Sequence, residues 1–159
     1  MVSSFGQIYA AWVSRAPSQS CVPDRPNSLC ARDAVHPTLP YLSQGAGISL
    51  EDAAVLGHIL AQRIPLSEAI VQYEALRRPR TTKIVAAATA QQYWYHLHDG
   101  EAQKHRDTVM GAEVSCEGDP FLWREPTFAP WLYGYDAYAE AEKAVEQGLS
   151  LGFANGTAN

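Results

Sequence analysis

Apolar residues recur every three or four positions through the middle of the chain, and this spacing predicts a mainly α-helical protein. After Gly47, one helical stripe holds four apolar side chains, which are Ala53, Leu56, Leu60 and Ile64. Three polar side chains lie off this stripe: Glu51, His58 and Gln62. Ser49 followed three positions later by Asp52 has the spacing of a capping box, so we expect the helix to begin near Ser49. Pro65 should end it.

A second long helix is predicted from Ser67 to the His-Asp-Gly turn at 98–100. Leu66 and Val71 occupy the two positions of a hydrophobic staple at its start. Its inward-facing side chains are expected to include Ile70, Tyr73 and Leu76. Because a proline inside a helix lacks an N–H donor and clashes with the preceding turn, we expect Pro79 to kink the helix or make it restart.

The remaining sequence is less regular. The polar stretch 101–120 predicts a short helix followed by a loop, and 125–147 returns to helical spacing with a break near Gly134. Both ends of the chain lack a sustained period. The chain is therefore expected to comprise an irregular N-terminal region, a central segment and a flexible tail, at 1–32, 33–147 and 148–159.

The bulk composition excludes several classes of protein. The 159 residues are enough for one ordinary domain, with 12 basic and 17 acidic side chains and a formal net charge of −5. There is no basic patch of the kind that binds nucleic acid and no apolar run of the roughly 20 residues that span a bilayer. Three cysteines without a Cys-x-x-Cys pair argue against a zinc site or a disulfide framework. We therefore expect a cytoplasmic protein, while the Ser-rich N-terminus leaves a mitochondrial location as the alternative.

Residues 33–47 combine features that a plain loop does not need. Gly45 and Gly47 permit positive φ angles and the close approach of a flat ligand, and the helix that follows points unpaired N–H groups at the same place. Asp33 offers a carboxylate that can accept hydrogen bonds from ligand hydroxyls. On spacing alone, the favoured alternative is a Pro/Gly-rich connection that only turns the chain into an amphipathic helix.

The order of residues in 32–60, RDAVHPTLPYLSQGAGISLEDAAVLGHIL, resembles the second flavin-binding motif of the FAD-dependent aromatic hydroxylases, the salicylate hydroxylase-like monooxygenases. The resemblance implies that Asp33 binds the ribityl and ribose region of FAD and that Pro40 lines the flavin where oxygen reacts. It also implies a turn whose amides face the N1–C2 carbonyl region of the flavin, made of Gln44, Gly45, Ala46 and Gly47. His36 falls on the motif's histidine, for which we expect a structural role rather than that of a base.

Three further stretches match the same family in the same order. They are YEALRRPRTTKIVAAATAQ at 73–91, HLHDG at 96–100 and WLYGYDAYAEAEKA at 131–144, so the resemblance covers roughly 33–147. It implies a parent protein with an α/β FAD/NAD(P)-binding, Rossmann-like fold. The parent reaction would be hydroxylation of a small aromatic acid such as salicylate, with NAD(P)H and dioxygen as co-substrates.

Two departures from the family pattern change what we expect of this chain. The family's opening Gly-Asp is Arg32-Asp33 here. No G-x-G-x-x-G signature is present, because the pattern begun at Gly45 meets Leu50 where its third glycine should stand. We therefore expect the C-terminal part of a monooxygenase, without the nucleotide-binding half and unable to bind FAD tightly alone. The alternative is a noncatalytic helical fragment or interaction module, with an exposed apolar face that favours self-association.

Other candidate sites have less support. No metal is expected, because one group of possible ligands lacks the defined spacing of a metal site. This group comprises His96, His98, Asp99 and His105. The basic run LRRPR at 76–80 is interpreted as a solvated helix end rather than a phosphate site. Packing roles are expected for four aromatic residues, which are Trp94, Trp131, Tyr133 and Tyr135.

Overall fold

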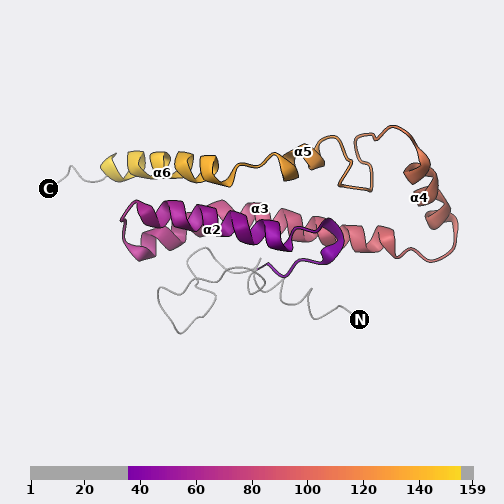
Figure 1. Ribbon diagram of the computed structural model, residues 1–159, viewed down its shortest axis with the longest axis horizontal. Coiled ribbons are helices and arrows are strands. Elements are labelled where there is room, and N and C mark those ends of the chain that lie inside the picture. The colour runs from indigo at the N-terminus through magenta and orange to yellow at the C-terminus, as the bar shows by residue number, and fades with distance from the viewer. Residues whose placement is uncertain (1–35, 155–159) are drawn as a thin grey trace.

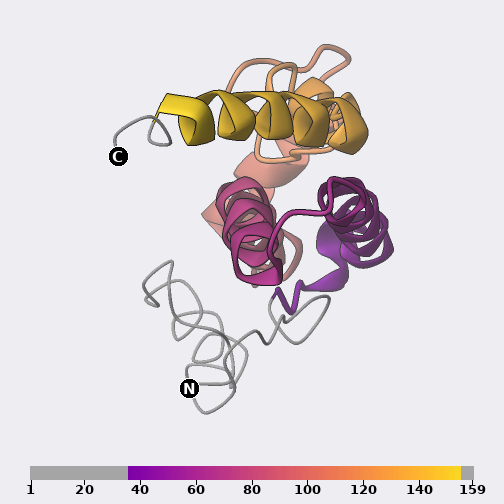
Figure 2. The same cartoon turned by 90° about the vertical axis from the view of Figure 1, so that its left-hand side faces the viewer.

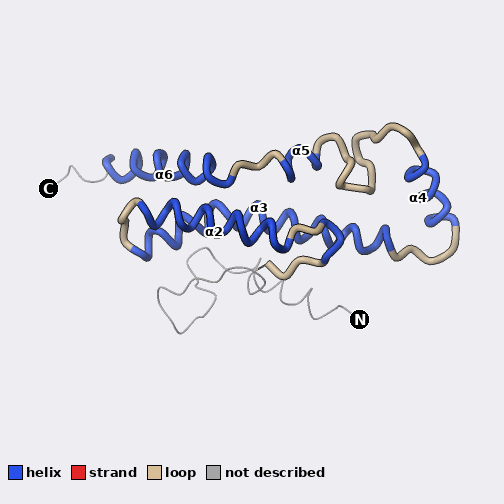
Figure 3. The backbone as a smooth tube through the Cα atoms, in the orientation of Figure 1, coloured by secondary structure: helices blue, strands red, loops and turns tan. Residues whose placement is uncertain are grey.

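The structure, a computed structural model, describes the backbone of residues 36–154 and the side chains of residues 36–147. Within these residues all regular structure is helical (Figure 3). The elements are the 3-10 helix η2 (Pro40–Leu42) and the α-helices α2 (Gly45–Ala61), α3 (Leu66–Tyr95), α4 (Glu101–Gly111), α5 (Phe128–Tyr133) and α6 (Ala137–Ala154). The prediction of a mainly helical chain is confirmed for this part. The expected N-terminal region 1–32 lies outside the described residues, as does Asp33.

α2 and α3 lie along the length of the molecule (Figure 1). α2 and α3 form an antiparallel hairpin, and α6 packs against both of them. The view along the helices shows α6 lying across the pair (Figure 2). After α3 the chain forms α4 at one end of the molecule and returns through a loop and α5 to α6, so the helix and loop expected within 101–120 are confirmed.

Buried apolar side chains form two clusters along this bundle. The first joins α2, α3 and α6, and comprises Val55, Ile59, Ala69, Tyr73, Ala141 and Val145. The second joins η2, α2, α3 and α5, and comprises Leu42, Ile48, Ile84, Ala88, Phe128 and Leu132. Each fully buried Leu, Ile or Phe side chain contributes about 1.5–3 kcal/mol relative to an exposed one. Because Leu42 and Ile48 lie on either side of residues 43–47, the second cluster anchors both ends of this turn.

The buried stripe of α2 differs from the predicted one. Ile48, Val55 and Ile59 are fully buried, whereas Ala53 is exposed and Leu60 is 46% exposed. The prediction is wrong for Ala53 and Leu60, whereas Leu56 and Ile64 pack against the cluster of Val55 and Ile59. The error arises because α2 carries apolar residues on two sides, so their spacing does not select one face of the helix.

α2 also begins four residues earlier than predicted, at Gly45 rather than near Ser49. The Ile48 amide donates to the Gln44 carbonyl oxygen at 2.8 Å and closes the first turn. Ser49 Oγ donates to the Gly45 carbonyl oxygen at 2.9 Å, which is a bond made from inside a helix and not from its N-cap. The expected capping box of Ser49 and Asp52 is therefore wrong.

α3 continues without interruption past Pro79, so of the two expected outcomes the restart is wrong, and the kink stays a prediction. Pro79 lies on the exposed side of the helix, where water can satisfy the carbonyl that loses its N–H partner. Leu66 and Val71 are 51% and 54% exposed, so the expected staple does not bury them. The inward positions of Ile70 and Tyr73 are confirmed.

The expected break near Gly134 separates α5 from α6. Gly134 has a φ of −88°, so no left-handed backbone requires glycine there. A Cβ at this position would lie 2.7 Å from the Pro130 carbonyl oxygen, which is too close for a side chain. Asp136 Oδ1 then accepts hydrogen bonds from the amides of Tyr138 and Ala139, each at 3.0 Å, and caps the start of α6.

Candidate functional site

The turn before α2 is reversed by a serine and not by a glycine. Ser43 has φ 53° and ψ 29°, and its amide donates to the Pro40 carbonyl oxygen at 2.9 Å. Gly45 and Gly47 belong to the first turn of α2, and neither is among the described residues with positive φ. The expectation that these glycines supply positive φ angles is therefore wrong, because the helix starts at Gly45 and gives both of them a helical backbone.

The N-terminal end of α2 is nevertheless open. The side chain of the N-cap residue Gln44 makes no capping hydrogen bond, and its Nε2 donates to the Leu42 carbonyl oxygen at 3.1 Å. Ala46 is exposed, with a glycine on either side. The first amides of a helix have no partner within the helix and carry partial positive charge. This end of α2 therefore offers hydrogen-bond donors to an electron-rich ligand edge.

His36 ties the segment that leads into the turn to α2. The side chain is buried, and its Nε2 lies 2.6 Å from Asp52 Oδ2, within hydrogen-bond distance. Asp52 is itself buried one turn beyond Ile48 on the core-facing side of α2. This position agrees with the structural role expected of the motif's histidine.

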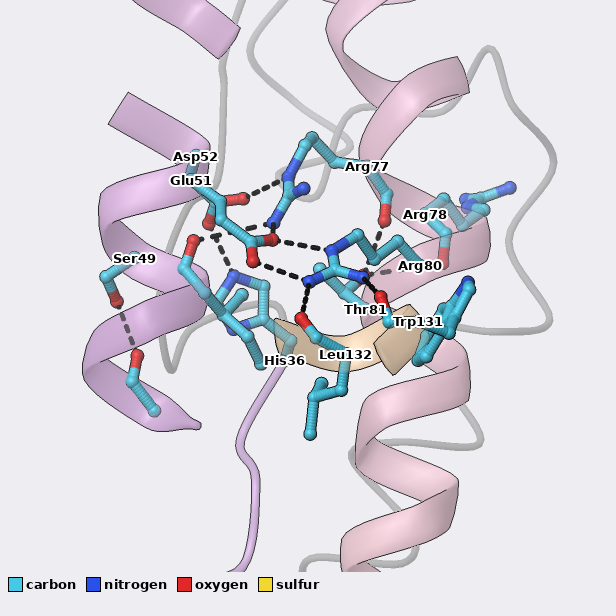
Figure 4. A network of polar contacts seen from close by, with 12 residues as sticks. His36, Ser49, Glu51, Asp52, Arg77, Arg78, Arg80, Thr81, Trp131 and Leu132 are labelled. Carbon is cyan, nitrogen blue, oxygen red and sulfur yellow. Dashed lines mark hydrogen bonds and ion pairs between the residues drawn. The ribbon is translucent and has the colours of Figure 1, made fainter. Parts of the chain in front are cut away.

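A buried ion-pair network joins α2 to α3 (Figure 4). Asp52 Oδ1 accepts a hydrogen bond from Arg77 Nε at 2.8 Å. Glu51 Oε2 accepts from Arg77 Nη2 at 2.8 Å and from Arg80 Nε at 2.7 Å, and Glu51 Oε1 accepts from Arg80 Nη2 at 2.6 Å. Arg77 and Arg80 are only 2% and 5% exposed, so the interpretation of 76–80 as a solvated helix end is wrong. Burial of these guanidinium groups is possible because two carboxylates on α2 face them.

The network holds Asp52 and Arg77 in their charged forms. Burial raises the pKa of the Asp52 carboxyl, but hydrogen bonds and charge from His36 and Arg77 outweigh burial and keep that pKa below its usual value. Burial lowers the pKa of Arg77, while Asp52 and Glu51 raise it further than burial lowers it. Burial and the nearby Asp52 charge both raise the pKa of Tyr73, which therefore remains neutral. Asp52 and Arg77 are thus both ionised at neutral pH.

Arg80 extends this network to the C-terminal signature. Its Nη2 donates to the Leu132 carbonyl oxygen at 3.0 Å, at the end of α5. Its guanidinium carbon lies 3.7 Å from the ring centroid of Tyr135 and 4.9 Å from that of Trp131. The packing roles expected for Trp131 and Tyr135 are confirmed, whereas Tyr133 is 59% exposed.

Comparison with known proteins gives a consistent result. No model of a protein family matches the chain. The chain is 43% identical over 121 residues to the FAD-dependent monooxygenase OpS4 of Beauveria bassiana (strain ARSEF 2860), a match covering 72% of this chain and 28% of that protein. It is 42% identical over 106 residues to the 3-amino-4-hydroxybenzoate 2-monooxygenase of Streptomyces cremeus, covering 66% and 24% of the two chains. It is 31% identical over 132 residues to the 3-hydroxybenzoate 6-hydroxylase 1 of Aquipseudomonas alcaligenes, covering 81% and 31%.

The chain is homologous to the FAD-dependent monooxygenases. The resemblance found in the sequence is thereby confirmed, and the relatives include aromatic hydroxylases. The matched part is 24–31% of the length of these relatives, so the chain spans about a quarter to a third of them.

The turn fits one edge of the cofactor that these monooxygenases use. Carbonyl oxygens at the edge of a flavin ring accept hydrogen bonds, and the uncapped amides at the start of α2 are donors. Pro40 and Ala46 are both exposed. The structure brings together five of the residues predicted to contact FAD, which are Pro40, Gln44, Gly45, Ala46 and Gly47. The sixth, Asp33, lies outside the described residues.

The histidines considered as metal ligands have other surroundings. His96 Nε2 lies 2.8 Å from the Tyr41 hydroxyl, which connects the end of α3 to η2. In the described part of the chain, no group of three or more His, Cys, Asp or Glu side chains is placed to hold a metal ion. Among residues 36–154, no helix combines the length and the apolar character needed to cross a membrane.

Sequence reasoning missed the network of Glu51, Asp52, Arg77 and Arg80. One signal was present, because Asp52 continues the four-three-four spacing of the truly buried residues of α2, which are Ile48, Val55 and Ile59. An acid at a core position requires a partner. The spacing of Arg77 and Arg80 places both on one face of α3, which makes them suitable partners.

Proposed function

We propose that this chain supplies the flavin-edge segment of an FAD-dependent aromatic hydroxylase. The observation that carries the proposal is the uncapped start of α2, where Ala46 is exposed between two glycines. FAD supplies the redox chemistry of oxygen insertion when it is bound. The residues of this chain bind and orient its edge.

Each predicted contact residue has a distinct part in this proposal. The amides of Gly45, Ala46 and Gly47 donate hydrogen bonds toward the pyrimidine edge of the flavin, and the helix dipole favours negative charge there. Pro40 contributes a rigid, apolar contact at the start of η2. Asp33 would accept hydrogen bonds from the ribityl and ribose hydroxyls, and its role rests on the sequence motif alone.

The reaction proposed for the parent protein is hydroxylation of a small aromatic acid, such as salicylate, with NAD(P)H and dioxygen. Relatives named for a hydroxybenzoate and an amino-hydroxybenzoate support the substrate class. Because the G-x-G-x-x-G signature is absent from the 159 residues, we expect the chain alone to bind FAD weakly. A cytoplasmic location stays a prediction.

One observation favours a second candidate function, a noncatalytic helical module that self-associates. The exposed side of α2 is also apolar and carries Ala46, Leu50, Ala53, Gly57 and Leu60. Leu50 is 72% exposed and Leu60 is 46% exposed. A continuous apolar stripe of this kind favours association with another surface, for which we propose a second copy of the chain.

A titration of the purified 159-residue chain with FAD tests the main proposal. Flavin fluorescence and the thermal unfolding midpoint are followed together. Saturable binding that raises the midpoint, and that Asp33→Ala weakens, supports a flavin-edge segment. A folded sample that shows no saturable binding at millimolar FAD contradicts it and leaves the helical module as the better account.

A further inference from the structure

The contact between His36 and Asp52 closes a loop around the turn that is proposed to face the flavin. The two residues are 16 positions apart, and the distance between His36 Nε2 and Asp52 Oδ2 is 2.6 Å. All five described contact residues lie between them in the sequence: Pro40, Gln44, Gly45, Ala46 and Gly47. The contact therefore fixes the segment that enters the turn relative to the helix that leaves it.

Asp52 is held from the other side as well. Its second oxygen, Oδ1, accepts the hydrogen bond from Arg77 Nε on α3, and both side chains are nearly inaccessible to solvent, at 4% and 3% exposure. Arg77 is in turn bound by Glu51 at 2.8 Å. With 30 residues, α3 is the longest of the described helices. Asp52 therefore connects the turn to this helix through Arg77.

We propose that the His36–Asp52 contact is a positioning device that sets the geometry of the turn 40–47 for the flavin edge; the inference rests on the function proposed above. Asp52 and His36 act through the turn and do not touch the cofactor. Without the contact, α2 keeps its packing through Val55 and Ile59, but the segment before the turn is no longer fixed against the helix. The amides at the start of α2 then lose their alignment with the ligand.

Three variants of the full 159-residue chain separate positioning from general stability. His36→Ala removes the contact, and His36→Gln replaces the imidazole with a side-chain amide that can still donate to Asp52. Val55→Ala is the matched control, because Val55 is fully buried on the same helix and its truncation destabilises the core without touching the turn. Each variant is titrated with FAD below its unfolding midpoint, and backbone hydrogen exchange is measured with and without FAD.

Positioning predicts that His36→Ala weakens FAD binding about tenfold, that His36→Gln recovers most of the loss, and that Val55→Ala binds FAD as the parent chain does. Equal affinity of His36→Ala and the parent chain overturns the inference, and so does an equal loss of affinity in Val55→Ala. If His36→Ala does not fold, Asp52→Asn takes its place, since it removes the carboxylate that His36 contacts and should weaken binding more than Val55→Ala does.

The hydrogen-exchange measurement tests the positioning role of His36 independently of the proposed FAD-binding function. If the unsubstituted 159-residue chain binds no FAD, the proposed function is contradicted. The inference then depends on the rate of hydrogen exchange at the backbone amides of residues 41–48, measured without FAD. Faster exchange at these amides in His36→Ala than in Val55→Ala supports the positioning role. Exchange that is unchanged, or that rises equally along the whole of α2 in both variants, overturns it.

Discussion

Asp52 and Arg77 form a buried ion pair between two helices, with 2.8 Å between Asp52 Oδ1 and Arg77 Nε across 25 positions of the sequence. Each partner makes the burial of the other possible, because a lone charge at either position would be desolvated without compensation. The pair also joins the helix that begins at the flavin-edge turn to the longest helix of the fold. Its loss is therefore expected to affect both stability and ligand binding.

Removing the cation tests how much the pair stabilises the fold. Arg77→Met leaves Asp52 buried with His36 alone and deprives Glu51 of one of its two arginines, so we expect a loss of about 3–5 kcal/mol in the free energy of unfolding. Urea denaturation measures it. The control is Lys104→Met, which breaks an exposed ion pair with Glu101 and should cost about 0–1 kcal/mol. Equal losses of unfolding free energy in the two variants would show that the buried network stabilises the fold no more than an exposed ion pair does.

The lowered pKa of Asp52 predicts a dependence of stability on pH. A carboxyl whose pKa is lower in the folded than in the unfolded state, here below 3.8, stabilises the fold at pH values above 3.8 and loses that stabilisation as the pH falls through its folded pKa. The excess stability of the parent chain over Asp52→Asn should therefore shrink as the pH falls below about pH 4. Denaturation curves of both chains over this range measure the difference. A difference that grows toward low pH would contradict the assignment.

The sequence predicted the helix breaks at Pro65 and Gly134 but not the buried face of α2. Pro65 and Gly134 act locally, through a missing donor and a forced backbone contact, and such effects can be read from one position. Which face of α2 is buried depends on the helices that pack against it. Because α2 has apolar residues on two sides, its own sequence does not determine the buried face. The motif proposed to face the flavin could be recognised in the sequence because its residues are close together along the chain, whereas Arg77, which binds Asp52, lies on another helix.

Gly134 offers a test of the backbone contact at the end of α5. Gly134→Ala would place a methyl group 2.7 Å from the Pro130 carbonyl oxygen, so α5 or the following segment must shift. We expect a loss of about 1–3 kcal/mol in the free energy of unfolding. Gly57→Ala is the opposite case, since nothing lies within 4 Å of a Cβ there, and it should stabilise α2 by up to about 1 kcal/mol. Tolerance of alanine at position 134 would show that the contact is not tight.

The exposed stripe of α2 predicts concentration-dependent self-association. Leu50→Glu places a charge at a leucine of this helix that is 72% exposed and should shift the chain toward the monomer in sedimentation velocity. Gln62→Glu adds the same charge at an exposed polar position just after the helix and should leave association unchanged. A parent chain that stays monomeric at high concentration would contradict a second copy as the partner of this stripe.

Gly47 allows the flavin-edge role to be tested apart from stability. A methyl group at this position would meet only Gln44 Oε1, at 3.2 Å, and that side chain can move away. Gly47→Ala should therefore keep or raise the thermal unfolding midpoint, because alanine is the better helix former. The same methyl group would occupy the space through which the backbone approaches the flavin, so FAD affinity should fall about tenfold. Gly57→Ala, ten positions further along the same helix, controls for the general effect of alanine and should bind FAD as the parent chain does. If Gly47→Ala and Gly57→Ala bind FAD equally well, the start of α2 is not where the flavin lies.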